Sequence, residues 1–156
     1  MFKIGIIGAG WIAEKMAEAI APSADMEVYA IASRSLEKAE EFAERWNICK
    51  AYGSYEEMVS DDSVDLVYIA TPHSHHYQHA MLALDHGKPV LVEKAFTANA
   101  SEAEELINTA RSRGIFITEA IWTRYMPLSH KVSEIMKSGI IGEPRVLTAT
   151  LCYMME

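Results

Sequence analysis

Short runs of consecutive apolar residues, rich in Val, Ile and Ala, recur along the chain, and longer amphipathic segments separate them. Five of these runs predict β-strands, at residues 3–7, 28–32, 66–70, 90–92 and 115–118. Within each run the apolar residues follow one another instead of alternating with polar ones, which is typical of a strand covered on both faces. The pattern therefore predicts a parallel sheet between two layers of helices.

The segments between these runs have the period of amphipathic helices. Residues 35–46 place Leu, Ala, Phe and Trp on one face and Glu and Lys on the other. Residues 75–86 and 101–113 behave similarly, and Gly87 and Gly114 can end those helices. The alternation of strands and helices predicts an α/β fold, a doubly wound parallel sheet of the Rossmann type with right-handed crossovers.

Beyond Gly142 the pattern changes, because side chains from Val146 to Tyr153 alternate between two faces as in a half-buried strand. We expect this strand to open a second, antiparallel α+β domain. The expected organisation is therefore a dinucleotide-binding domain over residues 1–122, a connecting helix over 123–143, and the first strand of an incomplete second domain over 144–156.

The composition is that of a globular protein, since half of the 156 residues are hydrophobic and 23% are charged. The net charge of −8 argues against nucleic acid or a membrane surface as a partner, because both require clustered Lys and Arg. No apolar run reaches the roughly 18 residues of a membrane span. Cys49 and Cys152 form no metal-binding or disulfide pattern, so we expect a cytoplasmic location.

The segment IGIIGAGWIA, residues 4–13, joins the first predicted strand to a GxGxxA turn. The first turn of a helix offers unpaired N–H groups and the positive end of its dipole, which together bind a pyrophosphate. Gly8 permits the tight turn, and Gly10 lets phosphates approach the backbone. The motif predicts that Gly8, Gly10, Trp11 and Ile12 bind a dinucleotide, although small residues also suit a purely structural turn.

The second predicted strand ends in IASRS, residues 31–35, where an NAD-specific site usually has Asp or Glu. A guanidinium and two hydroxyls suit a phosphate instead, and Lys38 follows one helical turn later. Ser33, Arg34 and Lys38 therefore predict recognition of the 2′-phosphate of NADP, with NAD as the less favoured cofactor. The alternative is that Arg34 is an ordinary exposed residue ahead of a helix.

Ligands of doubly wound sheets lie beyond the carboxyl ends of the strands. Three such ends carry polar and aromatic residues: ATPHSHH at 70–76, VEKAFTAN at 92–99 and TEAIWTRYMP at 118–127. With the glycine turn and the run GKPVLVEK at 87–94, these segments resemble the Gfo/Idh/MocA oxidoreductases over nearly the whole chain. Within that family they are most similar to the NADP-dependent dimeric dihydrodiol dehydrogenases, which also oxidise D-xylose.

The resemblance implies that Lys94 is the catalytic acid/base beside the nicotinamide. Elementary chemistry agrees, because an alcohol that loses a hydride must also lose a proton, and a cation stabilises the developing alkoxide. The alternative is an ordinary surface ion pair of Glu93 and Lys94. The family's proline after this pair is Ala95 here, which leaves the bend after Lys94 less constrained.

The resemblance further implies which side chains contact the cofactor. These are Thr71, Pro72, His73, His76, Glu93, Lys94, Trp122 and Arg124. Core packing is the alternative role for Trp122.

Four histidines, at positions 73, 75, 76 and 79, also suggest a metal site. The cluster contains no carboxylate, and Asp85 falls near the other end of the same predicted helix, so we expect no metal. We interpret His75 and His79 as helix-surface residues or as residues satisfied by hydrogen bonds.

Family members carry a C-terminal antiparallel sheet that closes over the nicotinamide and usually builds a dimer interface. We therefore expect this chain to be a fragment that binds NADP but turns over poorly by itself, and the full-length protein to be a homo-oligomer. Its expected function is hydride transfer between NADP and the CH–OH group of a sugar or trans-dihydrodiol. A non-catalytic NAD(P)-binding or sensing module is the alternative, and it would not need Lys94.

Overall fold

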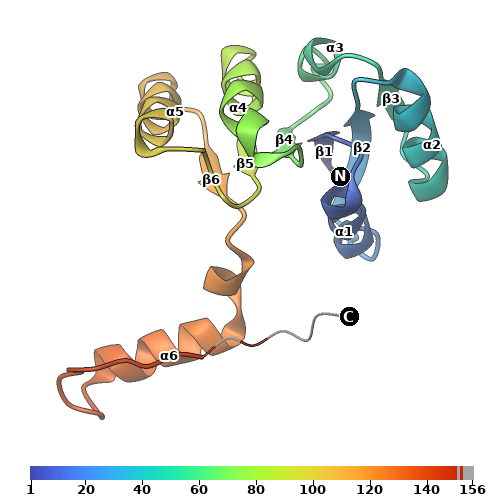
Figure 1. Cartoon of the computed structure of the whole chain (residues 1–156). Helices are drawn as coiled ribbons and strands as arrows, with labels where there is room; N and C mark the ends of the chain where they lie inside the picture. Colours follow the sequence, from blue (N-terminus) through green and yellow to red (C-terminus); the bar gives the residue numbers. More distant parts are fainter. Residues whose placement is uncertain (151, 153–156) are drawn as a thin grey trace. The chain divides into compact units, whose positions relative to one another are not determined.

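The computed structural model describes residues 1–150 and 152, and the chain forms two compact units, Met1–Ala120 and Ile121–Glu156. The first unit contains a six-stranded sheet with strand order β3-β2-β1-β4-β5-β6 (Figure 1). The strands are β1 (Phe2–Ile7), β2 (Met26–Ala32), β3 (Lys50–Tyr52), β4 (Leu66–Ile69), β5 (Val90–Val92) and β6 (Ile117–Glu119). Every neighbouring pair is parallel, which confirms the predicted doubly wound sheet.

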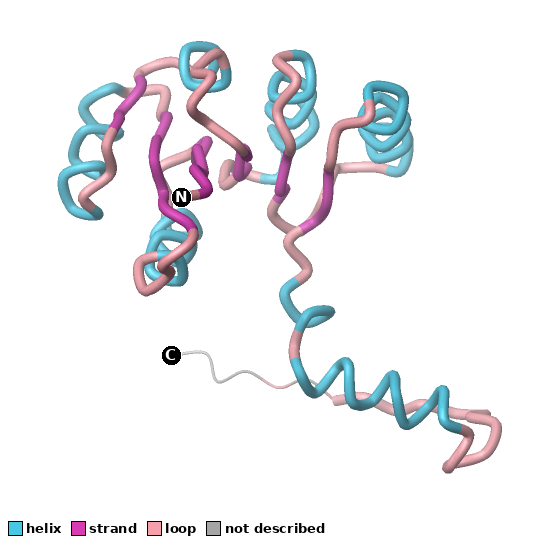
Figure 2. The backbone as a smooth tube through the Cα atoms, turned by 180° about the vertical axis from the view of Figure 1, so that it is seen from behind, coloured by secondary structure: helices cyan, strands magenta, loops and turns pink. Residues whose placement is uncertain are grey.

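Helices cover both faces of this sheet (Figure 2). One buried cluster joins the sheet to α1 (Trp11–Ile20) and α2 (Leu36–Trp46). The other joins the opposite face to α3 (Tyr55–Val59), α4 (His76–Asp85) and α5 (Ala100–Arg113). Because both faces are buried, the central strands need consecutive apolar residues, as the sequence predicts.

The helix starts follow from capping residues. Ser35 accepts a hydrogen bond from the Lys38 N–H and caps α2, and Asn99 accepts one from the Glu102 N–H and caps α5. Asn99, the last residue of the segment VEKAFTAN, is therefore a helix cap. Gly114 ends α5 in the left-handed conformation, with φ 67°.

Two short elements, β3 and α3, lie between predicted elements and were not predicted. Strand β3 has three residues, all half-buried, and α3 has five. Segments this short carry too few apolar positions to reveal a period. Tertiary pairing forms β3, since residues 30–32 of β2 pair with it.

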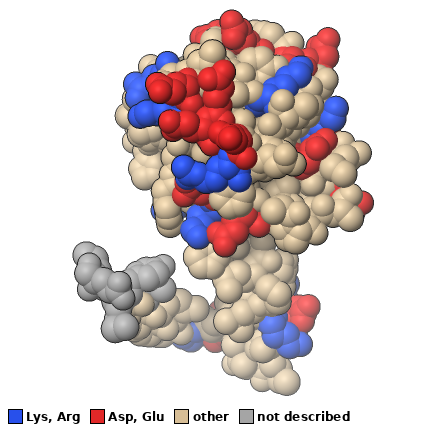
Figure 3. All heavy atoms as spheres, turned by 90° about the vertical axis from the view of Figure 1, so that its right-hand side faces the viewer, with Lys and Arg blue, Asp and Glu red and all other residues tan. Residues whose placement is uncertain are grey.

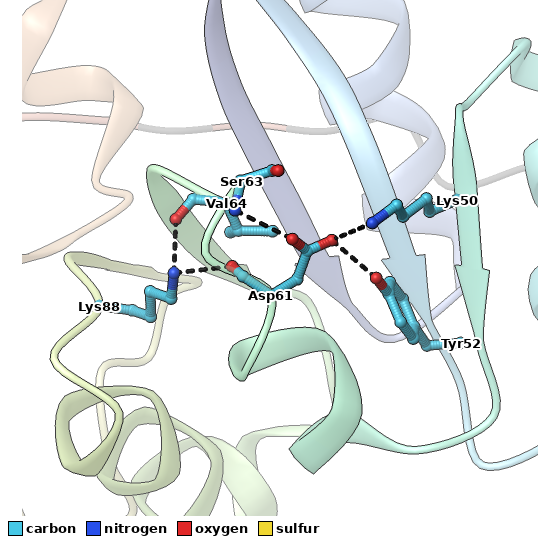
Figure 4. Close-up of polar contacts among 6 residues, drawn as sticks. All are labelled: Lys50, Tyr52, Asp61, Ser63, Val64 and Lys88. Atoms are coloured by element: carbon cyan, nitrogen blue, oxygen red, sulfur yellow. Dashed lines mark hydrogen bonds and ion pairs between the residues drawn. The ribbon is translucent and has the colours of Figure 1, made fainter.

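The connection from α3 into β4 is held by polar contacts around Asp61 (Figure 4). The Asp61 carboxylate accepts hydrogen bonds from Lys50 Nζ and Tyr52 Oη, both at 2.7 Å, and from the Ser63 N–H at 2.9 Å. Lys88 Nζ donates to the carbonyl oxygens of Asp61 and Val64, at 2.8 and 2.9 Å. We call these contacts the Asp61 cluster. They join β3 and Lys88, which lies just before β5, to the loop between α3 and β4.

The second unit contains the short turn η2 (Trp122–Tyr125) and helix α6 (Pro127–Ser138). The helix lies inside the connecting segment predicted over 123–143. Residues 144–150 form no strand in the described chain, so the first strand of a second domain over 144–156 stays a prediction. A strand satisfies its backbone groups through a neighbouring strand, and no described residue pairs with this stretch. Residues 151 and 153–156 lie outside the described residues.

The surface is charged and mixed in sign. In Figure 3, Asp and Glu side chains gather beside Lys and Arg on the side of the first unit that carries α2. Across the described residues, every helix is too short or too polar to span a lipid bilayer.

Candidate dinucleotide-binding site

The strand order brings the carboxyl ends of β2, β1, β4 and β5 into one row. A cleft of about 220 Å³ opens at the ends of β2, β1 and β4. It lies where the strand order reverses, which is the ligand-binding position of doubly wound sheets. The lining residues are Gly8, Ala9, Gly10, Ser33, Arg34, Lys38, Tyr55, Ala70, Thr71, Pro72, His75 and His79.

Gly8 and Gly10 contribute to the cleft in different ways. Gly8 has φ 101°, and a Cβ there would lie 2.9 Å from the Ala70 carbonyl oxygen, so glycine lets β1 approach the end of β4. A Cβ on Gly10 would meet no protein atom within 4 Å. The space beside Gly10 is therefore left open at the start of α1, where unpaired N–H groups favour an anion.

The predicted phosphate-recognition residues Ser33, Arg34 and Lys38 all line the cleft. Ser33 follows β2 directly, and its hydroxyl accepts a hydrogen bond from the Ser35 N–H. The Ser35 hydroxyl is occupied in capping α2. Both hydroxyl oxygens thus accept a backbone N–H, and each O–H can still donate to a phosphate.

His76 has a role that its sequence position did not reveal. Its side chain is fully buried, and its Nδ1 and Nε2 lie 2.8 Å from the carbonyl oxygens of Ala95 and Thr71. The ring thus joins the end of β4 to the loop after Lys94. The His76 ring packs edge to face against the His73 ring, with the ring centroids 5.3 Å apart. Neither residue is among those that line the cleft.

His75 and His79, which the sequence analysis left outside the site, do line the cleft. The Nδ1 of His79 lies 2.9 Å from Thr71 Oγ1, so the hydrogen-bonded state expected for it is present. Burial, followed by the neighbouring His75 and His76, lowers the pKa of His79 to about 4. Sequence spacing could not place these rings, because the turn η1 (His73–His75) interrupts the helical period.

Glu93 and Lys94 lie at the end of β5, next to β4 in the sheet. Tyr68 Oη donates to Glu93 Oε1 at 2.5 Å, and the Lys94 backbone N–H donates to Glu93 Oε2 at 3.1 Å. The Glu93 carboxylate is therefore held by groups other than the Lys94 amine, and the Lys94 side chain is exposed. Glu93 and Lys94 therefore do not form the surface ion pair that was the alternative interpretation.

A family model described as "Oxidoreductase family, NAD-binding Rossmann fold" (GFO_IDH_MocA) matches residues 2–120. The chain belongs to this family. The predicted resemblance is thereby confirmed.

Two characterised members of the Gfo/Idh/MocA family have similar sequences. D-xylose 1-dehydrogenase (NADP(+)) from Hypocrea jecorina is 49% identical, over 90% of this chain and 39% of that protein. Trans-1,2-dihydrobenzene-1,2-diol dehydrogenase from Mus musculus is 45% identical, over 93% of this chain and 44% of that protein. The chain thus spans less than half of the length of these relatives.

Solved structures of Gfo/Idh/MocA oxidoreductases give the same picture. The NAD-binding oxidoreductase from Klebsiella pneumoniae superposes with a TM-score of 0.86 and 34% identity, over 92% of this chain and 40% of that one. A 3-ketoreductase from Actinomadura kijaniata, solved in complex with NADP, has a TM-score of 0.81 and 34% identity, over 91% of this chain and 45% of that one.

The remaining predicted site residues of this Gfo/Idh/MocA chain are not in the cleft lining. Trp11 opens α1 as an exposed residue, and Ile12 follows it. Trp122 and Arg124 belong to η2 in the second unit, so their contact with a cofactor stays a prediction. Among residues 1–150 and 152, no group of three or more His, Cys, Asp or Glu side chains is arranged to hold a metal ion.

Proposed function

We propose that this chain is the NADP-binding half of an oxidoreductase that transfers a hydride between the nicotinamide and the CH–OH group of a sugar or trans-dihydrodiol. The observation that carries the proposal is the continuous row of strand ends, with Arg34 after β2, the glycine turn after β1 and Lys94 after β5. The names of the Hypocrea jecorina and Mus musculus relatives supply the two substrate classes.

The residues present fit an NADP molecule. The open space beside Gly10 and the first turn of α1 suit the pyrophosphate, since a Cβ at that position would fill space that no protein atom occupies. Arg34 and Lys38 suit the 2′-phosphate, because both are cations on the same rim of the cleft. No carboxylate lines the cleft to repel that phosphate or to bind a bare ribose.

When bound, the nicotinamide of NADP accepts or supplies the hydride. Lys94 takes the proton from the substrate hydroxyl during oxidation and returns it during reduction. Its exposed amine is free for this role, because Tyr68 and a backbone N–H hold the Glu93 carboxylate. His76 holds the backbone of the loop after Lys94 through the Ala95 carbonyl.

The decisive experiment is Lys94→Ala in the full-length protein. We expect NADP affinity to be retained and turnover with D-xylose or a trans-dihydrodiol to fall by at least about a hundredfold, the usual contribution of acid–base catalysis. Lys15→Ala, which changes an exposed lysine on α1, is the matched control. Unchanged turnover in the Lys94 variant would remove the catalytic assignment of Lys94, whereas NADP binding without any turnover by the wild-type full-length protein would favour the non-catalytic binding module.

Cofactor choice is tested separately, with Arg34→Ala in the 156-residue chain. NADP affinity should fall much more than NAD affinity, because only NADP carries the 2′-phosphate. An equal loss for both dinucleotides would contradict the proposed role of Arg34.

The proposal includes a cytoplasmic location and a homo-oligomeric full-length protein. The described cysteines, Cys49 and Cys152, are both free thiols, which suits a reducing compartment. The oligomer follows from the family resemblance.

A further inference from the structure

The dinucleotide cleft has histidines on the side opposite its cations. Arg34 comes from the connection of β2 to α2 and Lys38 from the first turn of α2, whereas His75 and His79 come from η1 and α4. The two imidazole rings stack with their centroids 5.7 Å apart. Nothing in the proposed function uses these rings, yet they line the same cleft as the residues assigned to the 2′-phosphate.

The contacts of the two rings leave one nitrogen of each available. His79 Nδ1 lies 2.9 Å from Thr71 Oγ1, and His75 Nδ1 lies 2.9 Å from Ser74 Oγ. Neither Nε2 has a hydrogen-bond partner among residues 1–150 and 152. Tyr55 packs edge-on against His79, with centroids 4.7 Å apart, and fixes that ring in the cleft.

Burial in the cleft keeps the His79 ring neutral, and most of the charged groups around it act in the same direction. Burial is the main cause of its lowered pKa, and His75, His76 and Arg34 lower it further, while Glu56 opposes them. A neutral imidazole has a single N–H. If the Thr71 hydroxyl donates to Nδ1, that N–H is on Nε2, so the ring offers a donor to an anion.

We propose that His79, supported by the stacked His75, is a specificity-determining residue that donates its Nε2–H to the 2′-phosphate held by Arg34 and Lys38. The phosphate is then bound by the cations that follow β2, Arg34 in the connection and Lys38 in α2, and by an imidazole from α4. NAD lacks this phosphate, so it leaves the donor without its acceptor. The inference rests on the proposed NADP site and assigns a further residue to it.

The test is isothermal titration of the 156-residue chain with NADP and with NAD. We expect His79→Ala to weaken NADP binding about tenfold, the loss of one hydrogen bond to a charged group, and to leave NAD binding nearly unchanged. His79→Gln should recover part of the loss, because its amide N–H can replace Nε2–H. His130→Ala, an exposed histidine of α6, is the matched control.

The other outcomes overturn the inference. Equal weakening of NADP and NAD by His79→Ala would mean that the ring contacts a part that both dinucleotides share, or that the variant has lost its fold. Melting temperatures measured in parallel separate these two causes. Unchanged binding of both would remove His79 from the site. If Arg34→Ala abolishes the preference for NADP while His79→Ala does not, the proposed function stands and only this inference fails. Failure of the wild-type chain to bind either dinucleotide overturns both.

Discussion

Gly8 and Gly10 lie two residues apart in one turn, but different surroundings require each of them. Gly8 is packed against the backbone of Ala70 and has a positive φ, so its requirement is internal to the fold. Gly10 faces space that no protein atom occupies within 4 Å of a Cβ. In the proposed function its requirement comes from the ligand, so the two positions are expected to separate folding from binding.

Substitution of each glycine by alanine tests this separation. Gly10→Ala should leave the melting temperature close to that of the wild type and weaken NADP binding several-fold. Gly8→Ala should cost about 1 to 3 kcal/mol, because it forces a side chain into a strained backbone conformation against a carbonyl. Thermal melts and NADP titrations of both variants check the prediction, and equal stability of the two variants would contradict it.

His79 also makes stability depend on pH. Its folded-state pKa is about 4, below its ordinary value of 6.5. Between these two values the unfolded chain binds a proton that the folded chain does not, so stability falls as the pH drops from 6.5 to 4 and levels off below. We expect the melting temperature of His79→Gln to fall less than that of the wild type over this range. Parallel melting curves at half-unit pH steps measure the difference, and superimposable pH dependences would refute it.

At the scale of elements, the Asp61 cluster explains part of the family motif. Lys88 belongs to the run GKPVLVEK, yet its amine binds the carbonyl oxygens of Asp61 and Val64 instead of a ligand. The Asp61 carboxylate itself accepts hydrogen bonds from Lys50 and Tyr52 of β3. One loop therefore fixes the short edge strand β3 and the start of β5, which in turn carries Lys94 to the cleft side of the sheet.

Asp61→Asn should loosen these elements. The hydrogen bond from the Lys50 ammonium contributes most to holding the pKa of Asp61 below its usual range. The hydrogen bonds from Tyr52 and the Ser63 N–H lower it further. Its stabilising effect is present above pH 3.8 and is lost as the pH falls below that value. At pH 7 we expect the variant to melt about 5 °C lower. The exposed neighbour Asp62 supplies the control variant, Asp62→Asn, and an equal effect of both changes would contradict a specific role for Asp61.

At the scale of the whole molecule, the chain consists of two units of unequal size. The sheet, its five covering helices and the cleft all belong to Met1–Ala120. Both buried clusters also lie within these residues. The first unit thus contains the complete core of a doubly wound domain.

Limited proteolysis tests the independence of this unit. We expect the first cleavages between residues 120 and 156, and a resistant product ending near Ala120 that still binds NADP. Mass spectrometry of the product and a titration with NADP provide the two measurements. Early cleavage inside the sheet, or loss of NADP binding with removal of the second unit, would show that residues 1–120 are not sufficient.

The sequence by itself determined the parallel sheet, its covering helices, the glycine turn and the Glu93–Lys94 pair at a strand end. These features are local, because consecutive apolar residues, helical periods and small residues at a turn each act within a few positions. The place of Arg34 and Lys38 in the cleft could be predicted for the same reason, since Arg34 lies just after β2 and Lys38 lies in the first turn of the helix that follows.

Only the tertiary structure decided which histidines face the cleft. His73, His75, His76 and His79 are close in sequence, but η1 shifts the helical phase between them, and packing of α4 against the sheet buries His76 while His79 lines the cleft. Contacts far apart in the sequence also formed β3 and the Asp61 cluster. Residues 144–150 form no strand in the described chain, because the hydrogen bonds of a strand require a neighbouring strand that the described residues do not supply.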